Sequence, residues 1–455
     1  METLTDILPG IMFLALVLGL FSNLPVPIVL CGVTLIFSVL AVVLGEMRMV
    51  HLSLLPNRIY GSIIENQVLV AAPMFIFMGL VMEKSRIAED LLVSLQRVLR
   101  VVPGGLALAV VLVGTILAAA TGIIGASVVM LTILAVPTML ERGYSPALAT
   151  GTVASAGTLG ILIPPSVMLV FIGDLLTINL AKLFVAALLP GLFLALIYVI
   201  YIVVRAYFDP ASAPRAPKPT EAEKEGMWLE FTVALVMPLL IIMSVLGSIL
   251  AGWATPTEAS GVGAFAALVL AFCRRRLNRE TLGDSLDGSI RTLAMLFFIF
   301  MAATAFAYVF RKIGGEHFIV DTARSLNLGD WGLLAMMMLM IFVMGFFFDW
   351  IEITLILLPI FAPIVQLMDF GDHVAKADLI YWFAVLMAVN LQTSFLTPPF
   401  GFALFFLKGA AGNMVTMRQI YRGIIPFVLL QLAVLAILIW QPSISVWLPN
   451  QLLGR

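Results

Sequence analysis

Charged side chains are scarce in this chain of 455 residues: only 11% are Asp, Glu, Lys or Arg, whereas 62% are hydrophobic. Soluble domains carry about 25% charged and about 45–50% apolar residues. So few charges exclude a surface covered by water, and they indicate that most of the chain lies in lipid. Backbone in lipid must satisfy its own hydrogen bonds, as helices do, so we predict an all-α polytopic membrane protein. A span takes roughly 20 apolar residues, and the apolar stretches allow about ten or eleven spans.

Cysteine and histidine are also rare. The two cysteines lie in separate apolar runs, the three histidines lie in polar connections, and no HExxH or CxxC motif occurs. These absences argue against a disulfide framework and a transition-metal site. They also argue against an intramembrane enzyme, because such an enzyme needs a nucleophile beside a base.

The net charge of −1 argues against nucleic acid as a partner. The first residues carry Glu2 and Asp6 in place of a basic segment. A cleavable signal peptide begins with positive charge, so we expect the first span to be retained.

Two apolar runs are too long for one simple span. Gly104–Leu140 and Gly332–Met368 each contain 37 residues. A single helix of that length would measure about 55 Å, far more than the roughly 30 Å hydrocarbon core. The centre of the first run is TGIIGAS (Thr121–Ser127), and the centre of the second is DWIEIT (Asp349–Thr354). We therefore predict two re-entrant helical hairpins; the alternative is one tilted, kinked helix in each run.

Each run is followed by a helix that a proline pair interrupts. The first reads GTLGILIPPS (Gly157–Ser166) and the second QTSFLTPPFG (Gln392–Gly401), and each precedes an apolar segment with a single proline, Pro190 or Pro426. Two adjacent prolines break a helix. Broken backbone at membrane depth persists only where protein buries it or water reaches it. The order of a long apolar run, a proline-broken helix and a segment with a single proline thus occurs twice. Such a repeated order is typical of transporters built from repeats.

The distribution of Lys and Arg predicts that the two repeats are inverted. When the base of the first hairpin is placed in the cytoplasm and the spans alternate, 17 of the 25 basic residues are cytoplasmic, as the positive-inside rule requires. The second hairpin then enters from the opposite face, and both termini lie outside. The cytoplasmic set is Lys84, Arg86, Arg97, Arg100, Arg142, Arg205, Arg215, Lys218, Lys224, Arg274, Arg275, Arg276, Arg279, Arg291, Lys408, Arg418 and Arg422.

These patterns divide the chain into five parts. Residues 1–102 are expected to form scaffold helices. Residues 103–180 would be the first half of a transport domain, with a hairpin at 104–140 and a broken helix at 146–173. Residues 181–310 would return to the scaffold and contain a solvated cytoplasmic linker, 209–226, rich in Pro, Ala and charge. Residues 311–411 would be the second half of the transport domain, with a hairpin at 332–368 and a broken helix at 379–411. Residues 412–455 would supply a last scaffold helix.

The predicted hairpin tips contain almost no basic side chains. No Lys or Arg occurs between Val101 and Glu141, and between Ser325 and Leu407 the only one is Lys376. Asp349 and Glu352 lie at the second tip, and Asp174 follows the first broken helix. An intramembrane carboxylate costs several kcal/mol unless it is compensated, and a bound cation is the simplest compensation. Broken helices expose carbonyl oxygens that suit Na⁺, so we predict Na⁺ as the coupling ion and no other cofactor.

Two ion clamps follow from this chemistry. The free N–H groups of half-helix N-termini remain compatible with an anionic substrate. The alternatives are hydroxyls that bond to their own helix, small residues that ease packing, and an Asp349 exposed to water at a hairpin tip. Asp174 is predicted to be a helix-end residue at the outer surface. The first clamp comprises Thr121, Gly122, Gly125, Ser127, Pro164, Pro165 and Ser166, the second comprises Asp349, Thr354, Thr397, Pro398 and Gly401, and the candidate substrate ligands are Ser127, Ser166, Glu352 and Thr393.

In this order the motifs resemble the large membrane subunit of tripartite ATP-independent periplasmic (TRAP) transporters, the DctM-like family. Besides the tips and the proline pairs, the resemblance rests on APMFIFMGLVMEKSRIAEDLL (Ala72–Leu92), PGGLALA (Pro103–Ala109), VPTMLERGYSPALATG (Val136–Gly151) and FFFDWIEITLILLPIFAPI (Phe346–Ile364). It covers essentially the whole chain.

The resemblance implies an elevator-type transporter of the bacterial inner membrane that imports a small organic acid anion with Na⁺. It also implies two separate partners, a small four-helix membrane subunit (DctQ-like) and a periplasmic solute-binding protein (DctP-like). In the family's pattern Asp349 and Thr397 fall on the second ion site, and the residues flanking Pro164–Ser166 fall on the first.

The chain departs from this family in two places. Many members have Ser-Gly-Ser at the first tip, whereas this chain has Thr121-Gly122-Ile123, which removes one hydroxyl. The stretch from Pro363 to Thr397 is also longer than usual, and its polar residues are expected on the outer face, either in a solvated loop or in altered contact with the binding protein. They are Asp369, Asp372, His373, Lys376 and Asp378. A stand-alone transporter of related two-hairpin fold, without a binding protein, is the main alternative; a channel is a further one.

Overall fold

The computed structural model describes residues 2–22, 24–121, 124–215, 227–325, 328–398 and 401–454. Across these residues every regular element is a helix and no strand occurs. Ten of the helical segments searched are long and apolar enough to cross a membrane. The prediction of an all-α, multi-pass membrane protein is therefore confirmed.

The N-terminal elements form one side of the bundle. The long α2 packs against α15, and α5 packs against both α14 and α15. The elements are α1 (Glu2–Leu20), α2 (Val26–Val43), α3 (Met49–Ser53), α4 (Leu55–Ile59), the π-helix η1 (Tyr60–Ile64), the 3₁₀-helix η2 (Gln67–Val70), α5 (Ala71–Lys84), α6 (Ile87–Val98) and the 3₁₀-helix η3 (Leu99–Val101).

The first apolar run of 37 residues is divided as predicted. It forms α7 (Gly105–Thr121) and α8 (Ile124–Glu141), which pack against each other. The first broken helix comprises α9 (Pro146–Thr158), the short η4 (Leu159–Ile161) and α10 (Val167–Leu175), and α11 (Leu180–Phe208) follows it.

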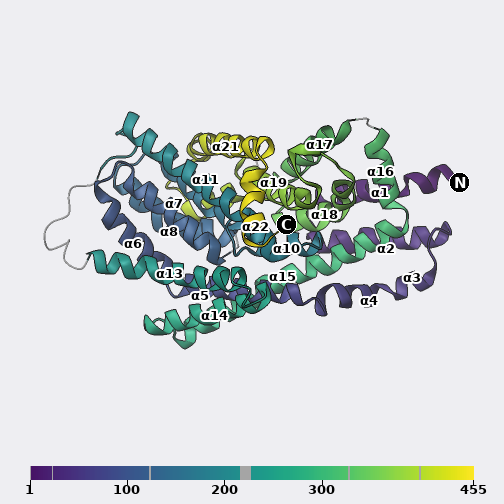
Figure 1. Cartoon of the computed structure of the whole chain (residues 1–455), viewed down its shortest axis with the longest axis horizontal. Helices are drawn as coiled ribbons and strands as arrows, with labels where there is room; N and C mark the ends of the chain where they lie inside the picture. Colours follow the sequence, from purple (N-terminus) through teal and green to yellow (C-terminus); the bar gives the residue numbers. More distant parts are fainter. Residues whose placement is uncertain are drawn as a thin grey trace.

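The second run is divided in the same way, into α17 (Gly329–Met344) and α18 (Trp350–Leu367). Its broken helix comprises α19 (Lys376–Leu396) and α20 (Phe402–Ala411), with the short η5 (Gly371–His373) before it. The two hairpins lie toward opposite ends of the long axis, α7 and α8 on the left and α17 and α18 on the right of Figure 1. The chain then ends with α21 (Met417–Trp440) and α22 (Ser443–Leu452).

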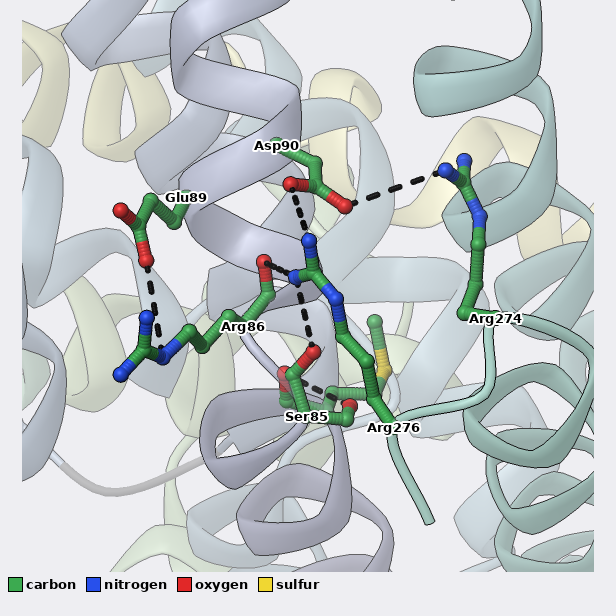
Figure 2. Close-up of polar contacts among 7 residues, drawn as sticks. Ser85, Arg86, Glu89, Asp90, Arg274 and Arg276 are labelled. Atoms are coloured by element: carbon green, nitrogen blue, oxygen red, sulfur yellow. Dashed lines mark hydrogen bonds and ion pairs between the residues drawn. The ribbon is translucent and has the colours of Figure 1, made fainter.

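Between the repeats lie α13 (Met227–Leu250), α14 (Pro256–Cys273), α15 (Arg279–Lys312) and α16 (Gly315–Ser325). Asp90 on α6 binds two arginines of the turn between α14 and α15: Arg276 at 3.0 Å and Arg274 at 3.8 Å. Arg276 also donates to the backbone carbonyls of Ser85 and Arg86 (Figure 2). This carboxylate therefore ties the turn between α5 and α6 to the turn between α14 and α15.

The centre of the molecule is packed through glycine. A Cβ atom on Gly423 of α21 would lie 2.0 Å from the carbonyl oxygen of Ala147 on α9, and one on Gly151 would lie 2.2 Å from the Gly423 oxygen. Gly114 of α7 and Gly157 of α9 make similarly close approaches to Ala156 and Val128. Only glycine permits these approaches, and they hold α9 between the first hairpin and α21.

Candidate functional site

At the first hairpin tip, α7 ends at Thr121 and α8 begins at Ile124. Gly122 and the side chain of Thr121 lie outside the described residues, so their assignment to the first clamp stays a prediction. Ser127 on α8 is buried, with 3% of its surface exposed. A Cβ atom on Gly125 would lie 3.0 Å from the ring of Phe406 on α20, so this glycine has a packing role between the two repeats.

The first helix break is fully buried. Pro164, Pro165 and Ser166 lie between η4 and α10 and are all shielded from solvent. The Ser166 hydroxyl donates to the carbonyl oxygen of Ile161 at 2.9 Å and so bridges the break. Its oxygen can still accept a further interaction. Val128, next to Ser127, packs directly on Gly157, so α8 brings Ser127 close to the helix that leads into this break.

At the second hairpin tip, two carboxylates cap the N-terminus of α18. Asp349 accepts a hydrogen bond from the backbone N–H of Trp350 at 2.7 Å, and Glu352 accepts one from the N–H of Asp349 at 3.2 Å. Carboxylates here complement the positive end of the helix dipole. Both side chains are half-buried. Helix capping is thus a structural role that both acids already fill, and it leaves further oxygen lone pairs available.

Thr354 lies two residues after Glu352 on α18, and its side chain is completely buried. Among the described residues its hydroxyl oxygen has no hydrogen-bond partner. A buried polar atom without a partner costs about 1–3 kcal/mol, so the Thr354 oxygen has bonding capacity that a ligand would satisfy. Of the residues predicted for the second clamp, Thr354 has the clearest unmet bonding capacity.

At the second break, Thr393 and Thr397 bond back to their own helix. The Thr397 hydroxyl donates to the carbonyl of Thr393 at 2.8 Å, and Thr393 donates to the carbonyl of Val389 at 2.8 Å. Thr397 and Pro398 are half-buried. Gly401 directly precedes α20, and a Cβ atom on it would lie 2.8 Å from the Phe395 carbonyl oxygen.

The tip of the second hairpin contacts the second broken helix. A Cβ atom on Gly345 would lie 1.8 Å from the Ser394 hydroxyl, so the end of α17 rests directly on α19. Trp350 of α18 meets Phe171 of α10 edge to face at 5.9 Å, which connects the second tip to the first repeat. The end of α17 thus packs on α19 and α18 packs beside α10, and the assignment of the second clamp stays a prediction.

A buried polar junction joins both broken helices, and the sequence reasoning missed it. Gln431 on α21 donates to the Tyr198 hydroxyl on α11, and Tyr198 also bonds Gln392 of α19. Gln392 reaches Thr158 at the end of α9, with 3.5 Å between nitrogen and oxygen. Glutamines inside apolar helices were the available signal, because buried amides need partners.

Asp378 forms a buried ion pair that the sequence reasoning also missed. Asp378 was assigned to a solvated outer loop, and this is wrong: only 8% of its side chain is exposed. Its carboxylate pairs with Lys182 of α11 at 3.0 Å and accepts from Asn450 of α22 at 2.7 Å. Lys182 lies 196 residues earlier in the chain, a separation that hides the pair from sequence patterns.

Asp174 does lie at the end of α10, where it accepts a hydrogen bond from Asn66 at 2.6 Å. Both residues line a cavity of about 390 Å³ between α10, α15 and α18, together with Arg311 and Glu316. Among the residues that were searched, no group of three His, Cys, Asp or Glu side chains is arranged to hold a metal ion.

Comparison with known families decides the class of this protein. The sequence model of the tripartite ATP-independent periplasmic transporter DctM component matches residues 10–444. The chain belongs to the DctM family. This DctM-family chain is therefore a transporter permease, and the predicted resemblance is confirmed.

Named relatives agree with that assignment. The C4-dicarboxylate TRAP transporter large permease protein DctM of Pseudomonas aeruginosa is 33% identical over 391 residues, which cover 85% of this chain and 87% of the relative. The protein of the same name from Vibrio cholerae is 27% identical, covering 87% and 88%. The 2,3-diketo-L-gulonate TRAP transporter large permease protein YiaN of Escherichia coli is 27% identical, covering 83% and 85%.

Two solved structures share the fold. The Alcanivorax borkumensis YdaH transporter superposes with a TM-score of 0.61 at 13% identity, covering 89% of each chain. Neisseria gonorrhoeae MtrF superposes with a TM-score of 0.53 at 14% identity, covering 87% of this chain and 83% of its own. At these identities the likeness concerns the fold alone.

Proposed function

We propose that this DctM-family permease imports a small organic acid anion together with Na⁺. The observation that carries Na⁺ coupling is the second hairpin tip. This tip carries the Asp349 carboxylate at the N-terminus of α18 and the buried Thr354 hydroxyl on the same helix, and its α17 end packs on α19 of the broken helix. No Lys or Arg occurs from Ser325 to Ala375, so no basic side chain of that segment competes for these oxygens. A hard cation coordinated by oxygen ligands matches this chemistry.

The first clamp would use the backbone carbonyls around Pro164–Ser166 together with Ser127. Ser166 and Ser127 are also the proposed substrate ligands of the first repeat, with Glu352 and Thr393 in the second. A bound cation near Asp349 would offset the negative charge of the acids and so allow an anion beside them. The C4-dicarboxylate relatives make dicarboxylates the first substrates to test.

We further propose that residues 103–180 and 311–411 move as one transport domain past the remaining scaffold. The supporting observations are the close glycine contacts that fasten α9 to the first hairpin, and the contact of Gly125 with Phe406 between the repeats. Helices packed this tightly cannot slide independently, so α21, whose Gly423 approaches α9 most closely, would move with the transport domain and not stay with the scaffold to which the sequence pattern assigns it.

The proposed partners are a small four-helix membrane subunit and a periplasmic solute-binding protein, both separate chains. The proposed location is the bacterial inner membrane with both termini outside. This orientation rests on the distribution of Lys and Arg, which places 17 of 25 basic residues on the cytoplasmic side. The alternative, a stand-alone transporter, would need neither partner.

The decisive experiment measures uptake of radiolabelled succinate into proteoliposomes that contain the purified permease and a small four-helix subunit from the same organism. We expect uptake only with an inward Na⁺ gradient and with the binding protein supplied outside. Full uptake without the binding protein would establish the stand-alone alternative. Equal uptake with choline in place of Na⁺ would overturn Na⁺ coupling.

A test that needs no substrate uses Na⁺ alone. An ion that binds only the folded protein stabilises it by mass action. We expect NaCl, and not KCl or choline chloride at equal ionic strength, to raise the thermal midpoint of the detergent-solubilised protein. Equal midpoints in the three salts would contradict a Na⁺ site.

A further inference from the structure

The cavity of about 390 Å³ that Asp174 lines lies at a boundary between two predicted parts of the chain. One wall is formed by α15 of the predicted scaffold, and the other by α10 and α18, which belong to the first and second repeats. Both α10 and α15 pack against α18 (Figure 1). The cavity therefore adjoins the second hairpin without being part of the predicted clamps.

The cavity extends from an exposed rim to a buried floor. On α15 its lining runs from buried Phe300 to exposed Arg311, and on α18 it runs from buried Leu355 to exposed Gln366. Each stretch advances 11 residues along its helix, which is about 16 Å at 1.5 Å per residue. Leu355 directly follows Thr354 of the predicted second clamp. The floor therefore lies at the end of the cavity that is nearer to the hairpin tip.

Aromatic contacts lead from this floor to the tip. The ring of Phe300 meets Phe171 of α10 edge to face, with 5.7 Å between the ring centroids. Phe171 in turn meets Trp350 at 5.9 Å, and the backbone N–H of Trp350 donates to Asp349. All three rings are buried. They form a continuous aromatic contact between the cavity floor and the residue that caps α18.

The lining of the cavity is rich in oxygen. Pro359 and Pro363 have no N–H, so the carbonyl oxygens of Leu355 and Pro359 lack their usual helical donor. Leu355 and Pro359 both line the cavity. Backbone carbonyls freed from a helix suit a Na⁺ ion. The lining residues with an oxygen acceptor and no full positive charge nearby on the same helix turn are Ser62, Asn66, Asp174, Thr304 and Gln366.

The charges of the lining favour a cation over an anion. Among the lining residues that the structure describes, Asp174 and Glu316 are acidic and Arg311 is basic, which gives a net charge of −1. Arg311 lies at the rim, where its Nε is 4.0 Å from a Glu316 oxygen and donates to the carbonyl of Ala307 at 3.4 Å. The charge of Asp174 has no such counterpart in the lining, since its partner Asn66 is neutral. A cleft with an excess of one sign concentrates ions of the opposite sign.

We propose that this cavity is the outer route by which Na⁺ reaches the second hairpin tip, and that the rings of Phe300, Phe171 and Trp350 close its inner end. The inference rests on the proposed Na⁺ coupling and on the charge pattern that places the end of α10 outside. Asp174 attracts the hydrated ion, and the oxygens of the lining replace part of its water as it moves inward. Asp174 thus speeds the arrival of Na⁺ without being a ligand at its final site.

The first test compares a rate with an equilibrium. Asp174→Asn removes the charge and keeps an oxygen that can accept from Asn66. We expect the initial uptake rate at low Na⁺ concentration to fall at least about threefold and to recover at saturating Na⁺, because the charge acts on the association rate. The rise in thermal midpoint at saturating NaCl should stay that of the wild type. The matched control, Asp372→Asn, removes an exposed acid that does not line the cavity and should change neither quantity.

The second test uses a cysteine as a reporter. In a variant whose exposed Cys31 and Cys273 are replaced by serine, Thr304→Cys places a thiol in the cavity wall. We expect a cationic, membrane-impermeant methanethiosulfonate added outside to modify it at least about tenfold faster than an anionic one, after correction for their reactivity with a free thiol. Met301→Cys, exposed on the same helix but outside the lining, should show no preference for the cation. Uptake before labelling establishes that the variants fold.

Four results would overturn the proposal. Faster reaction of the anionic reagent would make the cavity a route for an anion. Failure of both reagents to modify Thr304→Cys in a variant that still transports would exclude an open route. Unchanged uptake of Asp174→Asn at low Na⁺, where the wild type depends on Na⁺, would reject this route alone. Na⁺-independent uptake by the wild type would instead reject the proposed coupling on which the route rests.

Discussion

Asp349 combines two roles that substitution can separate. Its carboxylate caps α18 through the Trp350 N–H, and we propose that it also binds Na⁺. Asparagine caps helices about as well as aspartate, whereas alanine does not, at a cost of about 0.5–2 kcal/mol. Asp349→Asn should therefore keep near wild-type stability, while Asp349→Ala should lose about 1 kcal/mol. Both variants remove the charge.

The effect on Na⁺ affinity follows from the half-buried position of this side chain. Two opposite unit charges about 4 Å apart attract by about 4 kcal/mol at an effective dielectric constant near 20. Partial solvation of a half-buried carboxylate leaves roughly half of that. A loss of about 2 kcal/mol is about a 30-fold weaker affinity. We expect the Na⁺ concentration for half-maximal uptake to rise about 30-fold in Asp349→Asn and Asp349→Ala alike.

The assay is the initial rate of uptake into proteoliposomes against Na⁺ concentration, with ionic strength held constant by choline chloride. Glu352→Gln is the matched control, since it removes one negative charge from the same tip while keeping an oxygen that can accept from the Asp349 N–H. Unchanged Na⁺ dependence in Asp349→Asn would refute the second clamp. If Glu352→Gln raised the Na⁺ concentration for half-maximal uptake equally, Asp349 would act only through its negative charge at the tip and not as a direct Na⁺ ligand.

Further predictions concern packing and ion pairing. Gly423→Ala places a Cβ atom 2.0 Å from the carbonyl oxygen of Ala147 and should lower the free energy of unfolding by at least about 1–3 kcal/mol. The control Gly409→Ala meets nothing within 4 Å and should be neutral or stabilising. Thermal unfolding in detergent distinguishes the two variants. Lys182→Met leaves Asp378 buried without its cation and should cost about 3–5 kcal/mol, and a companion Asp378→Asn should recover part of the loss in the same assay. Gly345→Ala displaces the second hairpin tip and should reduce the uptake rate more than it reduces the thermal midpoint; an unaffected uptake rate would show that the tip tolerates the shift.

Local patterns were enough to predict the hairpins and the helix breaks. Run length compared with membrane thickness separates α7 from α8 and α17 from α18. The first proline pair lies between η4 and α10, and α19 ends at Leu396, close to the second predicted break. These features depend on a few neighbouring residues and on the bilayer, so sequence alone contains them.

Long-range pairing was not predictable in this way. The pairing of Lys182 with Asp378 and the junction of Tyr198 with Gln431 join segments about 200 residues apart. The roles of Asp349 and Glu352 show a related difficulty. The same carboxylates that a cation site needs also form a capping box, and the sequence pattern is identical for both roles.

The close crossing of α9 and α21 has a consequence for biogenesis. Gly423 is synthesised 272 residues after Gly151, so α9 emerges from the ribosome long before the helix that covers it. Until α21 has been synthesised, the face of α9 around Gly151, with Thr152 and Ser155 nearby, has no helix packed against it. We expect this segment to remain beside the insertion machinery or a chaperone until the C-terminal helix arrives. Truncation before α21 should therefore expose α9 to membrane proteases, even though every residue of α9 would be present.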